Sequence, residues 1–193
     1  MSYSHLASRI SHLASRIFLM IHIRPAQPTD VPTMLRFIRE LAEYEREPES
    51  AQATAADLLR DGWCLAADGV TTLEGSQQPR FAALIASLGG EAVGFALYFW
   101  TYSTWRGHHG IRLEDLYVTP AKRKHGVGKA LLARLAAIAV SEGCPRLEWD
   151  VLDWNAPAIT VYEKVGAQML TQWRIMRLAD EALHAMAALD VVP

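Results

Sequence analysis

The run Arg123-Lys124-His125-Gly126-Val127-Gly128-Lys129 follows a predicted strand that ends near Val118, and it opens an Ala/Leu-rich segment with helical spacing. Two glycines at such a junction let the backbone approach a ligand closely and leave N–H groups pointing outward. A helix N-terminus carries partial positive charge, and the basic side chains of the run add to it. The run therefore predicts a diphosphate cradle. The alternative interpretation is a glycine turn with a solvated basic face.

Two further motifs flank this cradle. LEDLYV (residues 113–118) precedes it, and WNAPAITVYEKVGA (residues 154–167) follows the next predicted strand. Together the three stretches resemble the GNAT superfamily of acetyl-CoA-dependent N-acetyltransferases. The resemblance covers residues 20–180 and implies an enzyme that uses acetyl-CoA as co-substrate and needs no metal.

Shorter stretches look like one branch of that superfamily, the diamine acetyltransferases. These are IRPA (23–26), LAEYE (41–45), GFALY (94–98), STW (103–105) and VLDWN (151–155). The branch includes spermidine/spermine acetyltransferases and a thialysine-acetylating relative, and the last two stretches look closer to the latter. The resemblance also marks a departure, because polyamine-acetylating members carry an acid where this chain has Ser103. The resemblance to this branch implies a small cationic amine as the acceptor.

The pattern of the chain predicts an α/β fold with the order β-α-α-β-β-β-α-β-α-β-α. We expect the GNAT fold, with a mixed, mostly antiparallel central sheet of about six to seven strands flanked by helices. The expected strands cover residues 20–24, 81–88, 91–102, 111–118, 146–152 and 167–178. The expected helices cover residues 31–45, 54–61, 127–142, 155–165 and 180–189, and residues 103–110 are expected to form a loop.

The resemblance assigns roles to individual residues. Tyr162 is the general acid at the sulfur of CoA, and Glu114 is the base that receives the amine proton, through water rather than directly. Asn155 is expected to bond the pantetheine arm, and so are the backbone amides of Leu116, Tyr117 and Val118. The alternatives are a surface ion pair for Glu114-Asp115 and a buried helix aromatic for Tyr162.

An amine pocket should be acidic and partly aromatic, because cations favour carboxylates and ring faces. The candidates are Tyr44, Glu45, Trp105, Glu114, Asp115 and Trp154. Glu114 and Asp115 point to opposite faces of an ideal strand, so a bulge is needed to present both. The alternative for the acidic run 43–49 is a solvated helix end.

Composition excludes several classes of function. The 193 residues carry 19 basic and 21 acidic side chains, a net charge of −2, so nucleic acid is an unexpected partner. No apolar run reaches the roughly 18 residues of a membrane span. Cys64 and Cys144 lack the spacing of a disulfide framework or zinc site, so we expect no metal and a cytoplasmic protein. His108-His109 is interpreted as part of a polar loop and Cys144 as a packing residue.

The first residues contain a perfect tandem repeat, SHLASRI at 4–10 and again at 11–17. We interpret residues 1–19 as a leader or misplaced start and residues 20–193 as a single acetyltransferase domain. A docking helix and a targeting peptide are the alternatives. The resemblance to the diamine acetyltransferase branch implies a homodimer. The competing hypotheses for function are acetylation of a protein lysine or N-terminus, and a CoA-binding regulatory module without turnover.

Overall fold

The computed structural model describes residues 21–75 and 78–190. Within them the chain divides into a first compact unit that ends at Leu152 and a second that begins at Asp153. The tandem repeat and the extension expected over residues 1–19 lie outside the described residues. No helix among the described residues is long and apolar enough to cross a membrane.

The first unit is built on a five-stranded sheet with the order β1-β2-β3-β4-β5. The strands are β1 (Ile21–Pro25), β2 (Ala82–Leu88), β3 (Glu91–Ser103), β4 (His108–Val118) and β5 (Leu147–Glu148). The first four pair antiparallel in chain order, and β5 pairs parallel with β4. The mixed, mostly antiparallel sheet is thus confirmed, although with five strands in the described residues rather than six to seven.

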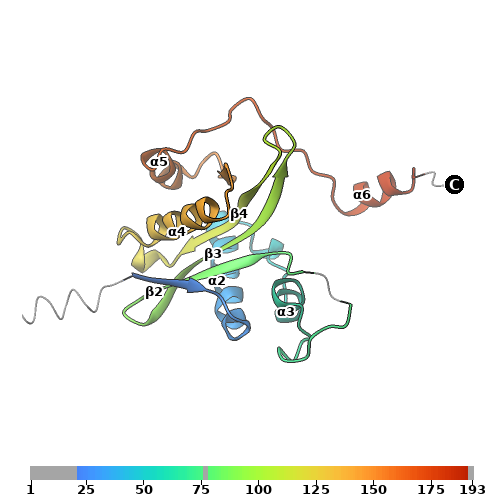
Figure 1. Cartoon of the computed structure of the whole chain (residues 1–193), viewed down its shortest axis with the longest axis horizontal. Helices are drawn as coiled ribbons and strands as arrows, with labels where there is room; N and C mark the ends of the chain where they lie inside the picture. The colour runs from blue at the N-terminus through green and yellow to red at the C-terminus, as the bar shows by residue number, and fades with distance from the viewer. Residues whose placement is uncertain (1–20, 76–77, 191–193) are drawn as a thin grey trace, which may run out of the picture. The chain divides into compact units, whose positions relative to one another are not determined.

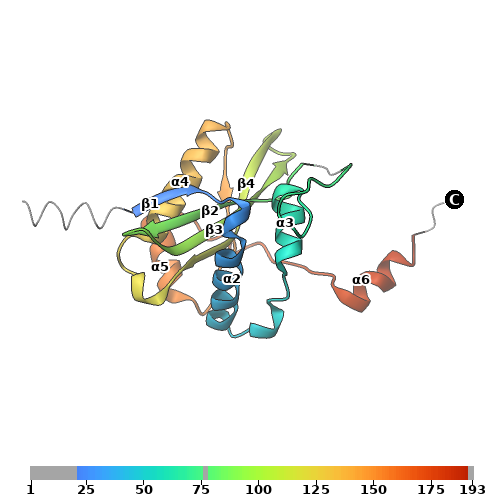
Figure 2. The same cartoon turned by 90° about the horizontal axis from the view of Figure 1, so that it is seen from below.

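Three α-helices cover the two faces of this sheet. Helices α2 (Val31–Glu45) and α3 (Ala55–Trp63) pack on one face, and α4 (Val127–Ser141) packs on the other (Figures 1 and 2). Short 3-10 turns, η1 (Pro28–Asp30), η2 (Pro48–Ser50) and η3 (Pro120–Lys122), lie between these elements. Helix α3 begins with a capping box, in which Thr54 accepts from the Asp57 N–H and the Asp57 carboxylate accepts from the Thr54 N–H.

An aromatic cluster fixes α2 against the sheet. The fully buried Phe37 stacks on Phe95 of β3, with ring centroids 5.7 Å apart, and its ring also lies 5.7 Å from Tyr117 of β4. Strand alternation places Ile85 and Leu97 in the same core cluster. This packing sets the position of the last turn of α2 relative to the end of β4, where the candidate site lies.

The hairpin between β3 and β4 is longer than expected. Residues 103–110 were expected to be a loop, but Ser103 pairs with His108 and only residues 104–107 form the turn. Gly107 takes a left-handed φ of 62° there, which favours glycine. The polar His108 and His109 break the apolar alternation, so the sequence pattern concealed the first residues of β4.

The second unit has two helices, α5 (Ala156–Lys164) and α6 (Asp180–Ala187). The strand expected over residues 167–178 is absent, and these residues form no regular element. The strand expected over 146–152 is reduced to the two residues of β5. Both segments have the composition of a strand, but a strand also requires a neighbouring edge to take its backbone hydrogen bonds. Periodicity does not report whether such an edge is present.

Candidate active site

A bulge in β4 presents both acids of the LEDLYV motif. Leu97 of β3 pairs with Asp115, whereas Tyr98 pairs with Leu113, so Glu114 is the extra residue of β4. A bulge of this kind lets adjacent side chains escape strict alternation. Glu114 is exposed and Asp115 is half-buried. The bulge that the two acids required is therefore present.

Three carboxylates act on one another at this bulge. Burial, and then the charges of Glu114 and Glu45, raise the pKa of Asp115 to about 6. Glu45 is the last residue of α2, and burial raises its pKa as well. Like charges and low solvent exposure both disfavour ionisation. The group formed by Glu45, Glu114 and Asp115, here called the acidic trio, is therefore suited to binding a cation.

An aromatic and acidic pocket opens beside the end of α2. It has a volume of about 400 Å³ and is lined by Glu40, Glu43, Tyr44, Tyr117, Thr119, Pro120 and Arg123. The Arg123 guanidinium lies over the Tyr44 ring, 4.5 Å from its centroid, and Arg123 Nε donates to the carbonyl of Val118 at 3.0 Å. Burial and the neighbouring Glu40 raise the pKa of Tyr117 to about 12. Arg123 therefore links the loop before α4 to the last turn of α2.

The rest of the glycine-rich run has the backbone expected of an anion cradle. Lys124 and Gly126 both take left-handed φ values, 66° and 86°, which turn the chain sharply into α4. His125 Nδ1 lies 2.9 Å from the carbonyl of Arg123 and closes the turn. Gly126 is the N-cap of α4, and no side chain caps that helix. The first N–H groups of α4 face no side-chain acceptor, which is the arrangement that binds phosphate.

Three residues of this N-terminus were singled out for cofactor binding, Val127, Gly128 and Lys129. Val127 is buried and anchors the helix, whereas Lys129 is exposed. A Cβ added to Gly128 would meet only Val118 Cγ2, at 3.8 Å, so packing does not require glycine at this position. The space beside Gly128 is therefore open, and its role toward a cofactor remains a prediction.

The edge of β4 that faces away from β3 loses β5 as its hydrogen-bonding neighbour before the bulge. Strand β5 pairs only with Ile111 and Arg112, so β4 and β5 separate beyond that point. The backbone of Leu116 to Val118 continues without β5 as a partner. Edge amides of this kind are ready to bond an extended ligand. The geometry fits the role in pantetheine binding that the resemblance implies.

Three of the predicted site residues belong to the second unit. Asn155 is the N-cap of α5, where its Oδ1 accepts from the Ala158 N–H at 3.3 Å. Tyr162 lies in the same helix and is half-buried, and Trp154 precedes it and is exposed. Asn155 and Tyr162 therefore share one short helix and its cap, and Trp154 stands immediately before that cap. Their roles toward CoA and the amine remain predictions.

The structure brings together only some of the predicted amine-binding residues of the first unit. Tyr44 and Glu45 share the last turn of α2, and Asp115 lies close enough to Glu45 for their charges to interact. Trp105 lies in the turn between β3 and β4 and is 88% exposed. Ser103, at the same turn, is buried, and its Oγ accepts from the Arg106 N–H at 3.2 Å. Ser103 thus adds a turn-stabilising hydroxyl and no charge.

Sequence reasoning missed two features of the site. It did not single out Asp115 as the acid with the displaced pKa, because that property depends on Glu45 approaching from a distant helix. It also assigned Arg123 only to the cradle, whereas the guanidinium packs on Tyr44. The aromatic and acidic residues of LAEYE marked one side of each contact, but no local pattern identifies their distant partners.

Comparison with known proteins finds an acetyltransferase family model and several acetyltransferase relatives. The family model described as Acetyltransferase (GNAT) family matches residues 36–167. Thialysine N-epsilon-acetyltransferase of Bos taurus is 36% identical over 178 residues, covering 86% of this chain and 97% of that protein. L-ornithine N5-acetyltransferase NATA1 of Arabidopsis thaliana is 33% identical over 202 residues, covering 88% and 89% of the two proteins. Spermidine/spermine N(1)-acetyltransferase-like protein 1 of Homo sapiens is 37% identical over 175 residues, 86% of this chain but 23% of that protein.

Solved structures show the same fold. An integron cassette protein from the mobile metagenome of V. cholerae superposes with a TM-score of 0.68 at 22% identity, covering 86% of this chain and 97% of that one. The aminoglycoside acetyltransferase meta-AAC0020, from an uncultured soil metagenomic sample, superposes with a TM-score of 0.66 at 14% identity, covering 83% and 97%. Family model, relatives and fold agree, and the chain belongs to the acetyltransferase (GNAT) family.

Proposed function

We propose that this acetyltransferase transfers the acetyl group of acetyl-CoA to a primary amine of a small cationic acceptor, a diamine, polyamine or thialysine-like molecule, by direct attack in a ternary complex. The observation that carries the proposal is the acidic trio, which gathers Glu45, Glu114 and Asp115 at the bulge of β4. The positive charge of a protonated amine would offset the repulsion among these three carboxylates.

The cradle residues fit the co-substrate. Acetyl-CoA, when bound, supplies an acetyl group activated as a thioester. The first N–H groups of α4 and the exposed Lys124 and Lys129 would hold its diphosphate, since that N-terminus has no side-chain cap. The amides of Leu116 to Val118 and the Asn155 side chain would hold the pantetheine arm. Lewis-acid assistance is not required, because backbone donors can polarise the carbonyl.

The acids would prepare the amine for attack. An alkyl amine with a pKa of about 10 is protonated at neutral pH and must lose that proton to become a nucleophile. Glu114 would receive it through water, and Asp115, with a pKa of about 6, is a stronger base than an ordinary aspartate. As the nitrogen–carbonyl bond forms and the carbon–sulfur bond breaks, the Tyr162 hydroxyl would donate a proton to the departing sulfur.

The acceptor is proposed to be small. Ser103 is neutral and buried where an acid would have added attraction for a long polyamine. Four relatives in the comparison carry the name thialysine N-epsilon-acetyltransferase, from cattle, pig, mouse and Caenorhabditis elegans. We therefore expect thialysine and short diamines to be better acceptors than spermine.

The test is the initial rate of CoA release from acetyl-CoA with thialysine, lysine, putrescine, spermidine, spermine and a lysine-containing peptide. The account predicts the highest kcat/KM for a small amine and a fall in Glu114→Gln. Turnover on the peptide alone would move the assignment to protein acetylation. Turnover on no acceptor, with acetyl-CoA still bound, would favour a regulatory module.

We also propose that the chain forms a homodimer through its C-terminal segment. Trp173, Ile175 and Met176 are all more than 60% exposed in a stretch with strand-like composition and no strand. A second copy of the chain offers the edge that such a segment lacks. Light scattering is expected to give twice the 21.5 kDa chain mass for the wild type and a lower mass for Ile175→Lys. A wild-type chain that stays monomeric contradicts this proposal.

A further inference from the structure

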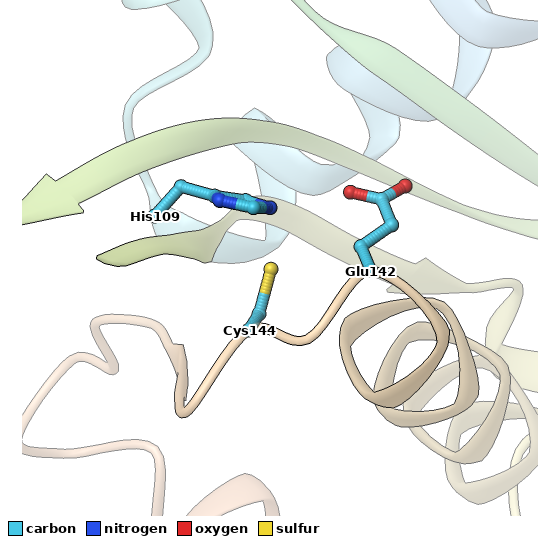
Figure 3. A group of neighbouring side chains, drawn as sticks. All are labelled: His109, Glu142 and Cys144. Carbon is cyan, nitrogen blue, oxygen red and sulfur yellow. The ribbon is translucent and has the colours of Figure 1, made fainter. Parts of the chain in front are cut away.

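Three potential metal ligands converge at the end of the first unit that lies away from the cradle. The ligand atoms of His109, Glu142 and Cys144 all lie within 4.8 Å of one another. Figure 3 shows the imidazole, the carboxylate and the thiol pointing toward one another from two separate segments. The function proposed above uses none of these residues.

The local fold explains the convergence. His109 is the second residue of β4, whereas Glu142 is the C-cap of α4 and Cys144 follows two residues later. Gly143 between them takes a left-handed φ of 71°, and the Cys144 N–H donates back to the carbonyl of Ala139 at 2.8 Å. This reversal turns the side chains of Glu142 and Cys144 to the same place.

One ligand already has a supporting contact. The Trp100 indole Nε1 donates to Glu142 Oε2 at 2.6 Å, which fixes the carboxylate and leaves Oε1 for another partner. Hydrogen bonds of this kind orient the ligands of metal sites and tune their affinity. The His109 ring also stacks on the ring of His108, with centroids 4.6 Å apart, which restricts its orientation.

We propose that His109, Glu142 and Cys144 form a binding site for a divalent zinc ion. Imidazole, thiolate and carboxylate are the ligands that zinc takes, and three of them leave one tetrahedral position for water. Bond lengths near 2.0–2.3 Å place tetrahedral ligands about 3.3–3.8 Å apart, so the side chains need to close by at most about 1.5 Å. Binding releases the thiol proton to solvent.

The degree of burial suits a metal better than a nucleophile. Cys144 is 8% exposed and lies at the interior end of the cluster. A thiol this buried is poorly placed to attack a substrate. Glu142 is exposed and gives an ion a path from solvent. The site would tie the C-terminus of α4 to the start of β4, about 22 Å along the 15-residue helix from the cradle.

The test uses Co²⁺ as a spectroscopic probe on the purified full chain, followed by competition with Zn²⁺. The wild type is expected to show a thiolate-to-cobalt charge-transfer band and tetrahedral d–d bands, which Zn²⁺ abolishes. Cys144→Ser should lose the charge-transfer band, and His109→Ala and Glu142→Gln should bind far more weakly. Trp100→Phe should weaken binding by about 10–100-fold, as other supporting residues of metal sites do.

Cys64→Ser is the matched control, because Cys64 lies at the end of α3 and outside the cluster. It should keep both sets of bands. Circular dichroism of each variant without metal separates lost ligation from lost folding. The proposal is overturned if the wild type gives no thiolate band in excess Co²⁺, or if the band survives in Cys144→Ser.

Discussion

Replacing Asp115 with asparagine is expected to remove a limb near pH 6 from the pH dependence of kcat/KM and to lower the rate above that pH by about 10²–10⁴-fold. The acceptor must lose a proton before it attacks. We propose that Asp115 shares with Glu114 the task of receiving that proton, and a carboxylate does so only when ionised. The wild-type rate should therefore rise as the pH increases through about 6, the pKa of Asp115. The measurement is the pH dependence of kcat/KM for the amine, taken at saturating acetyl-CoA.

The same substitution should stabilise the protein. Because the folded state raises the pKa of Asp115 from 3.8 to about 6, the stability from this group is full below pH 3.8 and is lost as the pH rises through 6. The asparagine side chain of the variant would carry no charge to repel Glu45 and Glu114. At neutral pH the free energy of unfolding should rise by about 1–3 kcal/mol, and in acid it should hardly change.

Two control variants test whether the change in the pH–rate profile is specific to Asp115. Glu74→Gln removes an exposed carboxylate outside the site and should leave both the rate and the limb unchanged. Glu114→Gln should lower the rate but keep a limb, displaced downward because one repelling charge is gone. A limb near pH 6 that persists in Asp115→Asn would show that another group titrates there.

Tyr162→Phe is expected to lower kcat by about 10²-fold or more while the Kd for acetyl-CoA stays unchanged. The substitution removes one hydroxyl and keeps the ring, so the half-buried packing of α5 is preserved. Without the phenol, the thiolate would leave without a proton donor. Tyr102→Phe is the matched control, because Tyr102 is an exposed tyrosine of β3 outside the proposed site.

The two readouts of this experiment separate the hypotheses for function. A fall in kcat with unchanged acetyl-CoA binding is the result expected of a catalytic acid. Equal kcat in Tyr162→Phe and wild type would remove Tyr162 from the chemistry. Loss of acetyl-CoA binding in Tyr162→Phe would instead make the tyrosine a positioning residue for the co-substrate.

The elements governed by short-range physics could be predicted from the sequence. Helix α2 spans 31–45 as predicted, because its apolar period is continuous and the chain reverses at Arg46, where φ is 67°. The turn between the expected strands 81–88 and 91–102 was likewise predictable, since Gly89 and Gly90 both take the positive φ that a two-residue hairpin demands. The bulge at Glu114 followed from the requirement that two adjacent acids face one site.

Features that depend on distant partners were not predictable. The segment 167–178 alternates like a strand, but alternation does not supply a partner edge. The packing of Arg123 on Tyr44 joins residues far apart in the chain, and no local pattern encodes it. Cys144 was interpreted as a packing residue. Its approach to His109 could not be foreseen from the sequence, because it arises only when the end of α4 meets the start of β4.

The most direct test of the central claim is to incubate the purified chain with acetyl-CoA and thialysine and to quantify both products by mass spectrometry. The account predicts that free CoA and monoacetylated thialysine accumulate in equal amounts, and that putrescine can replace thialysine. Bound acetyl-CoA with no acetylated product from any small amine would contradict the account.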